Sequence, residues 1–389
     1  DILVLKNNKG TEDNRVRRMD YSIQISKLFY ERFMNEEEIT LISPHMAPGL
    51  YEAFGTEDFD DLYLKYEADK TIPKKTVPAQ DLFFDLLKER AETGRIYIMN
   101  LDHCNSHSSF KDKVSMSNLC QEITLPTTPI QHIDDAEGEI ALCILSAVNV
   151  GALNDLGELE NICDLSVRAL EQIIDYQDYP VRAAEVSTKK RRSLGIGYIG
   201  LAHYLAKNGV KYSDPEAWAL VDRLTEAFQY YLLRSSCDIA MEKGKCEGFE
   251  RTKYADGLLP IDHYKKEVDE IVPHKQRMAW ESLRKDIAKY GLRHSTLSAQ
   301  MPSESSSVVS NETNGIEPPR ALLAIKKSKK GPLKQIAPGY PKLKNDYTLL
   351  WDMPNNEGYI NVVAMMQKYF DQAISGNWSY NPLQFENNE

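Results

Sequence analysis

Three side chains that could act together on a sugar lie at alternate positions of the segment 114–126: Asn118, Cys120 and Glu122. In an extended segment side chains alternate between two faces, so this spacing predicts an amide, a thiol and a carboxylate on one face. The amide can donate and accept hydrogen bonds, the carboxylate can take a proton, and the thiol carries a weak X–H bond. The trio predicts redox chemistry on a substrate with adjacent hydroxyls. For an isolated spacing of this kind, an ordinary strand with one buried cysteine is the commoner explanation.

A second group of chemically useful residues follows a short apolar run at 295–299. It consists of Ser303, Glu304, Ser305 and Ser306. Hydroxyls and backbone N–H groups that converge at the start of a helix are a common seat for phosphate. A plain helix cap, with Ser303 or Ser305 at the N-cap, explains the same residues equally well.

The six cysteines do not form a framework of regular spacings, which is typical of a reducing, cytoplasmic compartment. Cys143 lies in the apolar run 139–145, a pattern typical of a strand covered on both faces. A buried thiol that close in sequence to Cys120 could act as a reductant. The remaining four are expected to be small apolar core residues: Cys104, Cys163, Cys237 and Cys246.

Two further motifs are weaker. The hexapeptide 195–200 matches G-x-G-x-x-G, but it follows the basic run 189–192 rather than an apolar strand, so we reject a dinucleotide site. The basic run itself is expected to be a solvated entrance to a strand. The segment 103–107 contains two histidines and a cysteine, yet no second cluster completes a metal site, and a polar loop is expected there.

Composition limits the class of protein. The chain has 389 residues, of which 42% are hydrophobic and 27% are charged, as in globular proteins. No apolar run is long enough to span a membrane. The net charge of −11 disfavours nucleic acid as a partner. The first residues show neither an initiator methionine nor a signal-peptide pattern, so we expect a piece of a longer protein or a processed product.

Hydrophobic periodicity predicts alternating strands and helices. Strands are expected at 2–5, 39–42, 95–99, 139–145 and 295–299, and helices from 20 to about 33 and at 57–69, 79–92, 156–176, 215–243, 277–290 and 359–374. A polar loop is expected at 100–113 and a hairpin tip at 326–331. This order predicts an α/β fold with a mainly parallel sheet, curled into a barrel.

With these residues in view, the chain resembles the catalytic large subunit of class I ribonucleotide reductases of enteric bacteria and their phages. The similar stretches are 3–18, 93–110, 117–129, 138–150, 172–180, 195–208, 291–319 and 349–368. They include the run Asn-Gly-Ile-Glu-Pro-Pro at 314–319. The resemblance covers essentially the whole chain, and it makes the ordinary-strand explanation of the trio improbable.

The resemblance implies a role for each candidate residue. Cys120 matches the thiol that becomes a thiyl radical and abstracts the 3′-hydrogen of the ribose. Glu122 matches the base for the 3′-hydroxyl, and Asn118 matches the amide that binds the sugar hydroxyls. Cys143 matches one half of the reducing dithiol.

Further roles follow from the same resemblance. Ser303, Glu304, Ser305 and Ser306 match the loop that holds the substrate diphosphate. Arg95 matches an arginine beside the tyrosines that relay the radical. No metal ligand is implied in this chain.

The resemblance also implies an architecture, a ten-stranded α/β barrel of the glycyl/thiyl-radical enzyme type, with the active-site cysteine on a finger loop inside it. The barrel would be incomplete here. Residues 1–113 would be the C-terminal part of the first half, and 114–389 the finger loop and most of the second half, with helical and hairpin insertions. The mate of Cys143, the ATP and dNTP effector sites and the tail cysteines would lie outside this chain, so we expect the chain alone to be inactive.

The implied partners are a ribonucleoside diphosphate, a metal-containing small subunit that supplies the radical, thioredoxin or glutaredoxin as reductant, and either a second complete large subunit or a companion N-terminal chain. Two alternatives remain. One is a cobalamin-dependent relative, which needs no radical-supplying subunit. The other is a non-catalytic half, the product of a split gene, that completes a barrel with a companion chain.

Overall fold

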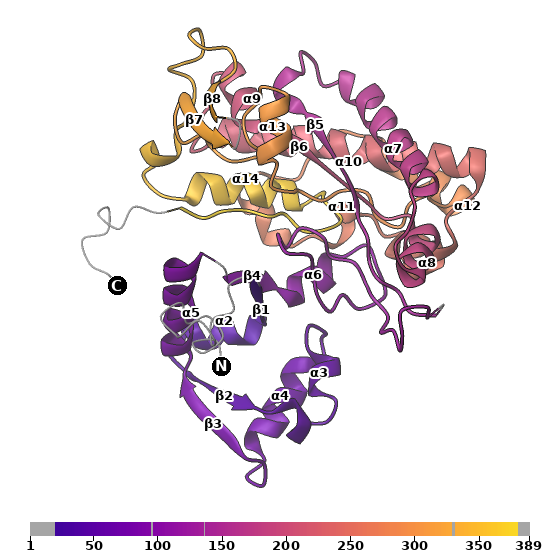
Figure 1. Ribbon diagram of the computed structural model, residues 1–389, viewed down its shortest axis with the longest axis vertical. Coiled ribbons are helices and arrows are strands. Elements are labelled where there is room, and N and C mark those ends of the chain that lie inside the picture. The colour runs from indigo at the N-terminus through magenta and orange to yellow at the C-terminus, as the bar shows by residue number, and fades with distance from the viewer. Residues whose placement is uncertain (1–19, 95, 136, 329–330, 380–389) are drawn as a thin grey trace. The chain divides into compact units, whose positions relative to one another are not determined.

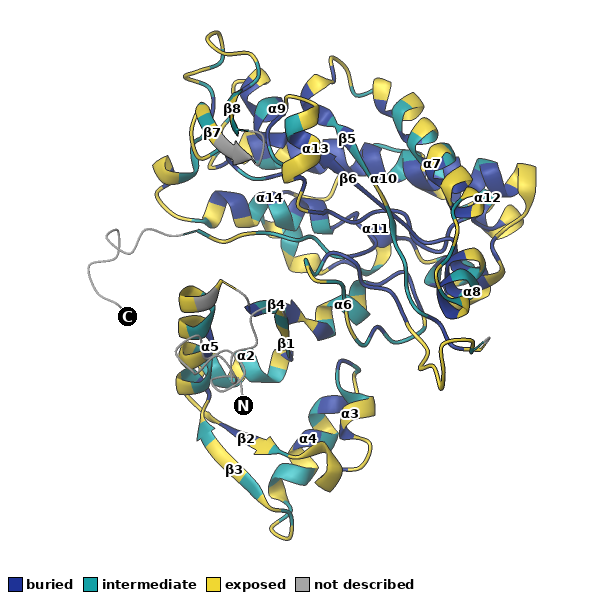
Figure 2. Cartoon of the chain, viewed as in Figure 1, coloured by how far each residue is buried: buried dark blue, intermediate teal, exposed yellow. Residues whose placement is uncertain are grey.

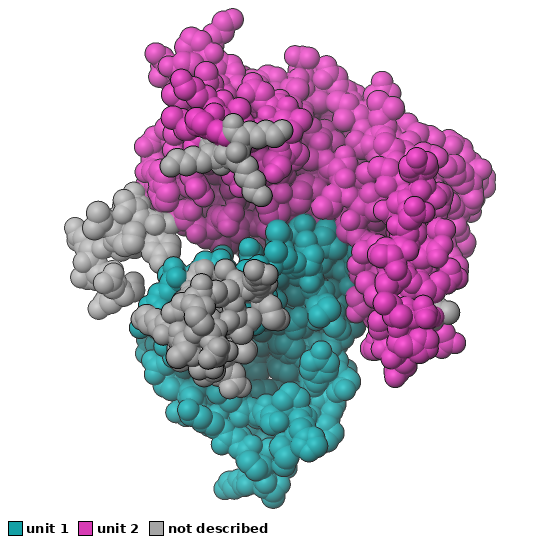
Figure 3. Space-filling model, in the orientation of Figure 1, with its two compact units in different colours: residues 1–108, 113–126 teal, residues 109–112, 127–389 magenta. Residues whose placement is uncertain are grey.

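The structure is a computed structural model that describes residues 20–94, 96–135, 137–328 and 331–379 (Figure 1). The chain divides into two compact units, which Figure 3 shows in different colours. Unit 1 comprises 1–108 and 113–126, and unit 2 comprises 109–112 and 127–389. Asn118, Cys120 and Glu122 therefore belong to unit 1. Cys143 and the serine-rich loop, residues 303–306, belong to unit 2. The expected strand 2–5 lies outside the described residues.

Unit 1 alternates short strands and helices. Its elements are β1 (Tyr21–Ile25), α2 (Lys27–Met34), β2 (Glu38–Ile42), α3 (Leu50–Ala53), α4 (Phe59–Ala68), β3 (Lys74–Pro78), α5 (Ala79–Thr93), β4 (Ile96–Asn100) and α6 (Leu101–His107). β1 pairs with β4 in parallel, and β2 pairs with β3 antiparallel. The helix α5 ends at Gly94, whose φ of 65° is the left-handed conformation expected of a C-terminal glycine.

Two predictions for unit 1 were wrong. The helix expected from residue 20 is instead the strand β1 followed by α2, because Ser26 caps α2 by accepting a hydrogen bond from the N–H of Phe29 at 3.3 Å. The expected polar loop 100–113 contains the helix α6, whose first residue, Leu101, is buried with Met99 and Val114. A local cap at Ser26 decides the start of α2, and the burial of Leu101 decides α6; hydrophobic periodicity records neither contact.

Unit 2 contains the longer helices. Its elements are β5 (Ile144–Asn149), α7 (Glu158–Tyr176), α8 (Arg182–Arg191), β6 (Leu194–Ile199), α9 (Leu201–Lys207), α10 (Pro215–Lys243), α11 (Pro260–His263), α12 (Trp280–Tyr290), α13 (Glu304–Val309), β7 (Leu323–Ser328), β8 (Gly331–Ile336) and α14 (Glu357–Gln367). Short 3-10 helices lie in the loops of both units: η2 (Pro44–Met46), η3 (Val150–Ala152), η4 (Glu247–Arg251), η5 (Lys253–Asp256), η6 (Lys266–Glu270) and η7 (Leu350–Asp352).

The central feature of unit 2 is a set of parallel extended segments. Two of them, β5 and β6, pair in parallel. The segment 295–300 lies parallel to β6 through a bridge between Ile196 and Ser298. The segment 371–375 lies parallel to it in turn, through a bridge between Gln300 and Ile374. The prediction of a parallel sheet is confirmed here, while the ladders of β2 with β3 and of β7 with β8 are antiparallel. Over the described residues no sheet closes into a barrel.

The core of unit 2 forms between the long helices and this sheet. The helix α10 packs against α7 and α14, and much of its length is buried (Figure 2). The predicted limits of this helix are confirmed, with Pro215 in its first turn and Gly244 after its end. Cys163, Cys237 and Cys246 are buried in the same core, as predicted for small apolar residues.

The basic run 189–192 was wrongly predicted to be a solvated entrance to a strand. It forms the end of α8, and both Arg191 and Arg192 are buried. Arg191 forms an ion pair with Glu139 and donates to Asp112 at 3.0 Å. Gly195 and Gly197 lie within β6, and Gly200 alone lies at the junction of β6 and α9, so the glycine loop between a strand and a helix that a dinucleotide site requires is absent.

The apolar run 139–145 was predicted as a strand, but β5 begins only at Ile144. The backbone of Glu139 instead pairs with Thr128 in an isolated antiparallel bridge. The side chain of Glu139 forms an ion pair with Arg191 at the end of α8, and this ion pair holds the segment against the helix. The hairpin predicted around 326–331 is confirmed by β7 and β8, although residues 329–330 at its tip lie outside the described residues.

Candidate functional site

The segment that carries Cys120 is anchored to unit 1 by two side-chain amides. Asn105 of α6 pairs with the backbone of Val114, accepting from its N–H at 2.8 Å and donating to its carbonyl at 3.0 Å. Gln24 of β1 donates to the carbonyl of Ser115 at 2.6 Å. These contacts replace ladder hydrogen bonds for a segment that has no strand partner among the described residues, so the segment enters the site in a defined position.

From Asn118 the chain turns instead of continuing as the extended segment that was predicted. The N–H of Gln121 donates to the carbonyl of Asn118 at 3.2 Å, and Gln121 has a φ of 72°. The turn abolishes the simple alternation of faces, but it still joins two members of the trio. The Nδ2 of Asn118 donates to Oε1 of Glu122 at 2.8 Å, and the N–H of Ile123 donates to Oδ1 of Asn118 at 3.1 Å. Cys120 is therefore held at the apex between an amide and a carboxyl that contact each other.

The surroundings of the turn favour the protonated forms of both Cys120 and Glu122. Glu122 is 2% exposed, and its burial raises its pKa, an effect that the hydrogen bonds from its own backbone and from Asn118 only partly offset. The second carboxyl oxygen, Oε2, is buried without a donor among the described residues. Burial also raises the pKa of Cys120, and the nearby charge of Glu122 adds to this. A protonated thiol is the form that can give up a hydrogen atom, and a raised pKa makes the carboxylate of Glu122 a stronger proton acceptor.

Cys143 lies one residue before β5, at the amino end of that strand, and it is half-buried. Its position differs from the wholly buried strand that the sequence predicted. The partial exposure is consistent with a thiol that reacts, in contrast to Cys163, Cys237 and Cys246 in the core, for which burial raises the pKa.

The serine-rich loop lies at the carboxyl end of the parallel segment 295–300 and leads into α13. Ser303 occupies the N-cap position, but its hydroxyl makes no capping bond and donates instead to the carbonyl of Met301 at 3.1 Å. Glu304, Ser305 and Ser306 in the first turn are exposed. Side chains at the carboxyl ends of parallel strands are a recurrent place for ligands in α/β proteins.

The motif at 314–319 supports this loop, a contact that sequence reasoning did not anticipate. Asn314 accepts a hydrogen bond from the N–H of Ser303 at 3.2 Å, and Gly315, with a φ of 50°, accepts one from the N–H of Leu201 at 3.2 Å. Gly200, at the end of β6, donates its N–H to the carbonyl of Thr313 at 3.1 Å. The motif thus ties the serine-rich loop to the end of β6. Arg95, the predicted neighbour of the radical path, lies outside the described residues.

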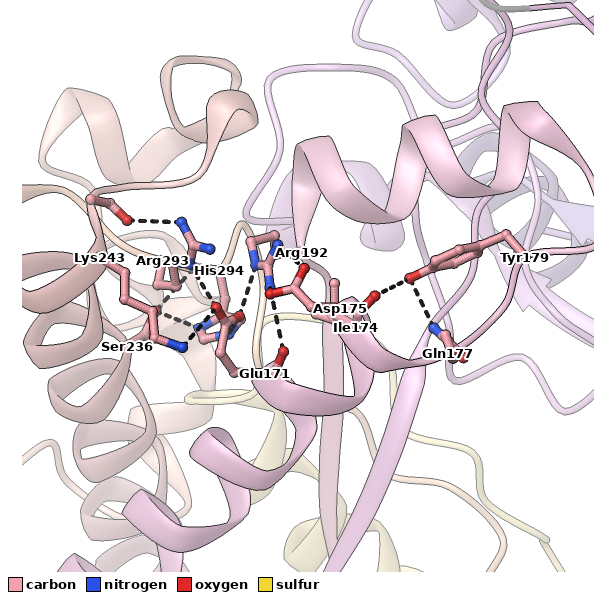
Figure 4. Close-up of polar contacts among 11 residues, drawn as sticks. Glu171, Ile174, Asp175, Gln177, Tyr179, Arg192, Ser236, Lys243, Arg293 and His294 are labelled. Carbon is pink, nitrogen blue, oxygen red and sulfur yellow. Dashed lines mark hydrogen bonds and ion pairs between the residues drawn. The ribbon is translucent and has the colours of Figure 1, made fainter.

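Sequence reasoning also missed a buried charged cluster around Glu171 of α7 (Figure 4). Arg192 and Arg293 each donate to its carboxylate at 2.8 Å. The Nε2–H of His294 donates to the same carboxylate at 3.1 Å, and Nδ1 of His294 lies 3.0 Å from the hydroxyl of Ser236. Burial alone would raise the pKa of Glu171, but these donors more than offset it and lower the pKa to about 2. Because both carboxylate oxygens of Glu171 are held by these donors, this cluster is a structural one.

Neither a metal centre nor a membrane helix emerges from the described part of the chain. The histidines at 103 and 107 lie on α6, and no group of three or more His, Cys, Asp or Glu side chains there could hold a metal ion. None of the helices that the structure describes combines the length and apolar character needed to cross a membrane.

Comparison with known proteins places these features in a family. Residues 1–346 match the family model described as ribonucleotide reductase, barrel domain. The chain is 57% identical over 391 residues to the ribonucleoside-diphosphate reductase subunit alpha of Haemophilus influenzae. The aligned region covers 99% of this chain and 52% of that protein. It is 53% identical over 389 residues to the ribonucleoside-diphosphate reductase 1 subunit alpha of Escherichia coli, covering 99% of this chain and 51% of that protein.

A more distant relative is the ribonucleoside-diphosphate reductase subunit alpha of enterobacteria phage T4, at 42% identity over 395 residues, with 99% of this chain and 52% of the phage protein covered. The chain thus spans about half the length of the curated relatives it matches.

Proposed function

The chain belongs to the ribonucleotide reductase family, and from that premise we propose that it is the part of a large subunit that reduces ribonucleoside diphosphates to 2′-deoxyribonucleoside diphosphates by a thiyl-radical mechanism. The observation that carries the proposal is the turn at 118–122. In this turn the amide of Asn118 donates a hydrogen bond to the carboxyl of Glu122, and Cys120 lies between these two residues in the sequence. An amide, a thiol and a carboxyl so grouped can bind and activate a vicinal diol.

In the proposed reaction Cys120 acts first. Its sulfur loses a hydrogen atom to a radical generated elsewhere, and the resulting thiyl radical takes the 3′-hydrogen of the ribose. Glu122 takes the proton of the 3′-hydroxyl while the 2′-hydroxyl leaves as water. The raised pKa of Glu122 suits this task, since a carboxylate with a higher pKa is a stronger base. Asn118 both binds the sugar hydroxyls and orients the carboxyl of Glu122.

Cys143 and a second cysteine from outside this chain supply two electrons and two protons. One proton completes the departing water and one hydrogen atom goes to C2′, while the second electron reduces the 3′-carbonyl as Glu122 returns the proton that it took. The two thiols end as a disulfide. The 3′-hydrogen returns from Cys120 to the ribose, which restores the thiyl radical. The sum is one ribonucleotide and two thiols giving one deoxyribonucleotide, one disulfide and one water.

The substrate diphosphate is assigned to the loop of Ser303, Glu304, Ser305 and Ser306. Three of these residues are exposed in the first turn of α13, and the fourth is held by Asn314. N–H groups at the start of a helix and the serine hydroxyls can donate to phosphate oxygens. Glu304 would repel a diphosphate if its carboxylate pointed toward it, so we assign no phosphate contact to that carboxylate.

The proposal includes partners and architecture that belong to the whole enzyme. A metal-containing small subunit supplies the radical, and thioredoxin or glutaredoxin reduces the disulfide in the cytoplasm. Effector nucleotides bind in parts of the protein outside this chain. The parallel segments of unit 2 would be one portion of a ten-stranded barrel, and the turn at Cys120 would be the tip of its finger loop. The complete subunit is expected to form a homodimer or to assemble from companion chains.

The test is the variant Cys120→Ser in the complete large subunit, assayed with its small subunit. Serine has a much stronger O–H bond and cannot form the radical, so turnover should be lost while the fold, followed by circular dichroism, is kept. Cys104→Ser is the matched control, because Cys104 lies in the same unit on α6 and has no assigned role. Turnover that survives Cys120→Ser would remove the mechanism.

A second candidate rests on the observation that the chain covers about half of its relatives. The chain would then be a non-catalytic half that only completes a barrel with a companion chain. Mixing it with a chain that carries the missing N-terminal portion distinguishes the two. Activity that appears on mixing and disappears with Cys120→Ser supports the catalytic assignment, whereas activity that persists with the variant supports the structural one.

A further inference from the structure

Gln121 contacts the backbone of the turn both through its own N–H and through its side-chain amide. Its N–H donates to the carbonyl of Asn118 at 3.2 Å, and its side-chain Nε2 donates to that same carbonyl at 3.1 Å. Nε2 also lies 3.4 Å from the carbonyl of Leu119. The side chain therefore folds back over the peptide groups that immediately precede Cys120.

The backbone of Gln121 has a conformation that side chains normally avoid. Its φ of 72° lies in the left-handed region, which glycine and asparagine adopt far more readily than glutamine. A glutamine in this conformation needs compensating contacts. The two carbonyl contacts of its Nε2 are such contacts, and to make them the amide leaves its buried Oε1 without a donor among the described residues.

The side chains of Asn118 and Gln121 thus reach past Cys120 in opposite directions. Asn118 reaches forward, with its amide contacting Glu122 and Ile123. Gln121 reaches backward, with its amide contacting the carbonyls of Asn118 and Leu119. Cys120 lies within the loop that these two amides close.

We propose that Gln121 is a positioning residue, whose side-chain amide locks the turn and thereby fixes the place of the Cys120 sulfur. Its importance for turnover rests on the function proposed above, but the lock itself does not. Gln121 does not need to touch the substrate for this role. Removing its donors should let the turn open more often and expose the sulfur, with little effect on the rest of unit 1.

The lock can be tested on the 389-residue chain by measuring how fast iodoacetamide alkylates each cysteine, with peptide mass spectrometry and over a range of pH. Gln121→Met keeps the length of the side chain and removes its donors. It should accelerate alkylation of Cys120 about three- to tenfold, which is the factor that corresponds to losing one ordinary hydrogen bond. Gln121→Lys retains a donor at the end of a long side chain and should restore a rate close to that of the parent.

Two controls separate a local lock from general loosening. Cys143, which belongs to unit 2, serves as the internal reference and should keep its rate in every variant. Gln80→Met is the matched variant, because Gln80 also donates its amide to a backbone carbonyl of unit 1, that of Phe33 at 3.5 Å. An unchanged rate at Cys120 in Gln121→Met, or an equal acceleration at Cys143, would overturn the inference.

Turnover of the complete enzyme supplies the second readout. Gln121→Met should lower kcat by about three- to tenfold and leave KM unchanged, since a lock on the sulfur affects the chemical step rather than substrate binding. A parent enzyme without reductase activity would contradict the proposed function, yet the alkylation rates would still decide the lock. A raised KM with an unchanged kcat would instead show that Gln121 contacts the substrate.

Discussion

Glu122 in unit 1 and Glu171 in unit 2 are almost equally buried, at 2% and 1% exposure, but their pKa values move in opposite directions. Glu122 receives one side-chain hydrogen bond, from the neutral amide of Asn118, and its pKa is raised by burial. Glu171 accepts hydrogen bonds from two arginines and a histidine, and its pKa falls to about 2 in spite of its burial.

The donors around a buried carboxyl, rather than its burial, therefore decide whether it carries charge. Glu171 is locked in its ionised form and links α7 to Arg192, before β6, and to Arg293, after α12. Glu122 keeps one oxygen without a donor among the described residues and is not locked in either form. The first arrangement suits a structural anchor, and the second suits a group that exchanges protons with a substrate.

The largest expected effect is that of Glu171→Gln. The substitution leaves Arg192 and Arg293 without their carboxylate, and breaking a buried ion pair in this way costs about 3–5 kcal/mol. Urea denaturation followed by circular dichroism measures the loss. Glu242→Gln, which removes one exposed partner of Arg168, is the control and should have a much smaller effect. A Glu171→Gln protein as stable as the parent would refute the anchor role.

The same anchor predicts sensitivity to acid. The pKa of Glu171 is lowered from its ordinary 4.5 to about 2, so its contribution to stability is complete above pH 4.5 and is lost as the pH falls toward about 2. Burial also lowers the pKa of His294 from its ordinary 6.5, so its neutral form stabilises the fold and this contribution is lost as the pH falls below 6.5. Unfolding free energies measured across this range should decline less steeply in Glu171→Gln than in the parent.

A smaller effect is expected from Asn118→Leu, which removes the single amide donor of Glu122 at nearly constant volume. The hydrogen bond from Asn118 lowers the pKa of Glu122, so its loss should raise that pKa further, and stability should fall by about 1 kcal/mol. Titration of the ¹³C-labelled Glu122 carboxyl by NMR measures the shift. If the carboxyl titrates as in the parent, the contact between the two side chains does not govern its charge.

The smallest change in stability is expected from Glu122→Gln, the same substitution that is so costly at residue 171. Because the folded-state pKa of Glu122 is raised, its stabilising effect is complete below pH 4.5 and is lost as the pH rises through the folded pKa. A neutral amide avoids this loss, so the variant should be as stable as the parent or up to about 1 kcal/mol more stable at neutral pH. Turnover of the complete enzyme should nevertheless collapse. A large loss of stability would show that Glu122 is an anchor like Glu171.

Features that depend on neighbouring residues could be predicted without the structure. The limits of α10 follow from Pro215 in its first turn and Gly244 after its end, and the end of α5 follows from Gly94. Hydrophobic periodicity was sufficient for α7, and the apolar character of free cysteine was sufficient for Cys163, Cys237 and Cys246. The grouping of Asn118, Cys120 and Glu122 was also readable, because residues two apart stay close whatever the backbone does.

The orientation and the charge of those groups could not be predicted in this way, because both depend on contacts formed by folding. The turn at Gln121 depends on a left-handed residue and side-chain contacts that alternation of faces does not encode. The charge of Glu171 depends on His294, which lies far along the chain, and the burial of Arg191 depends on Glu139 and Asp112. The physical reason is that a short window of sequence records which faces are apolar, whereas the free energy of a buried charge is set by donors that folding brings from distant parts of the chain.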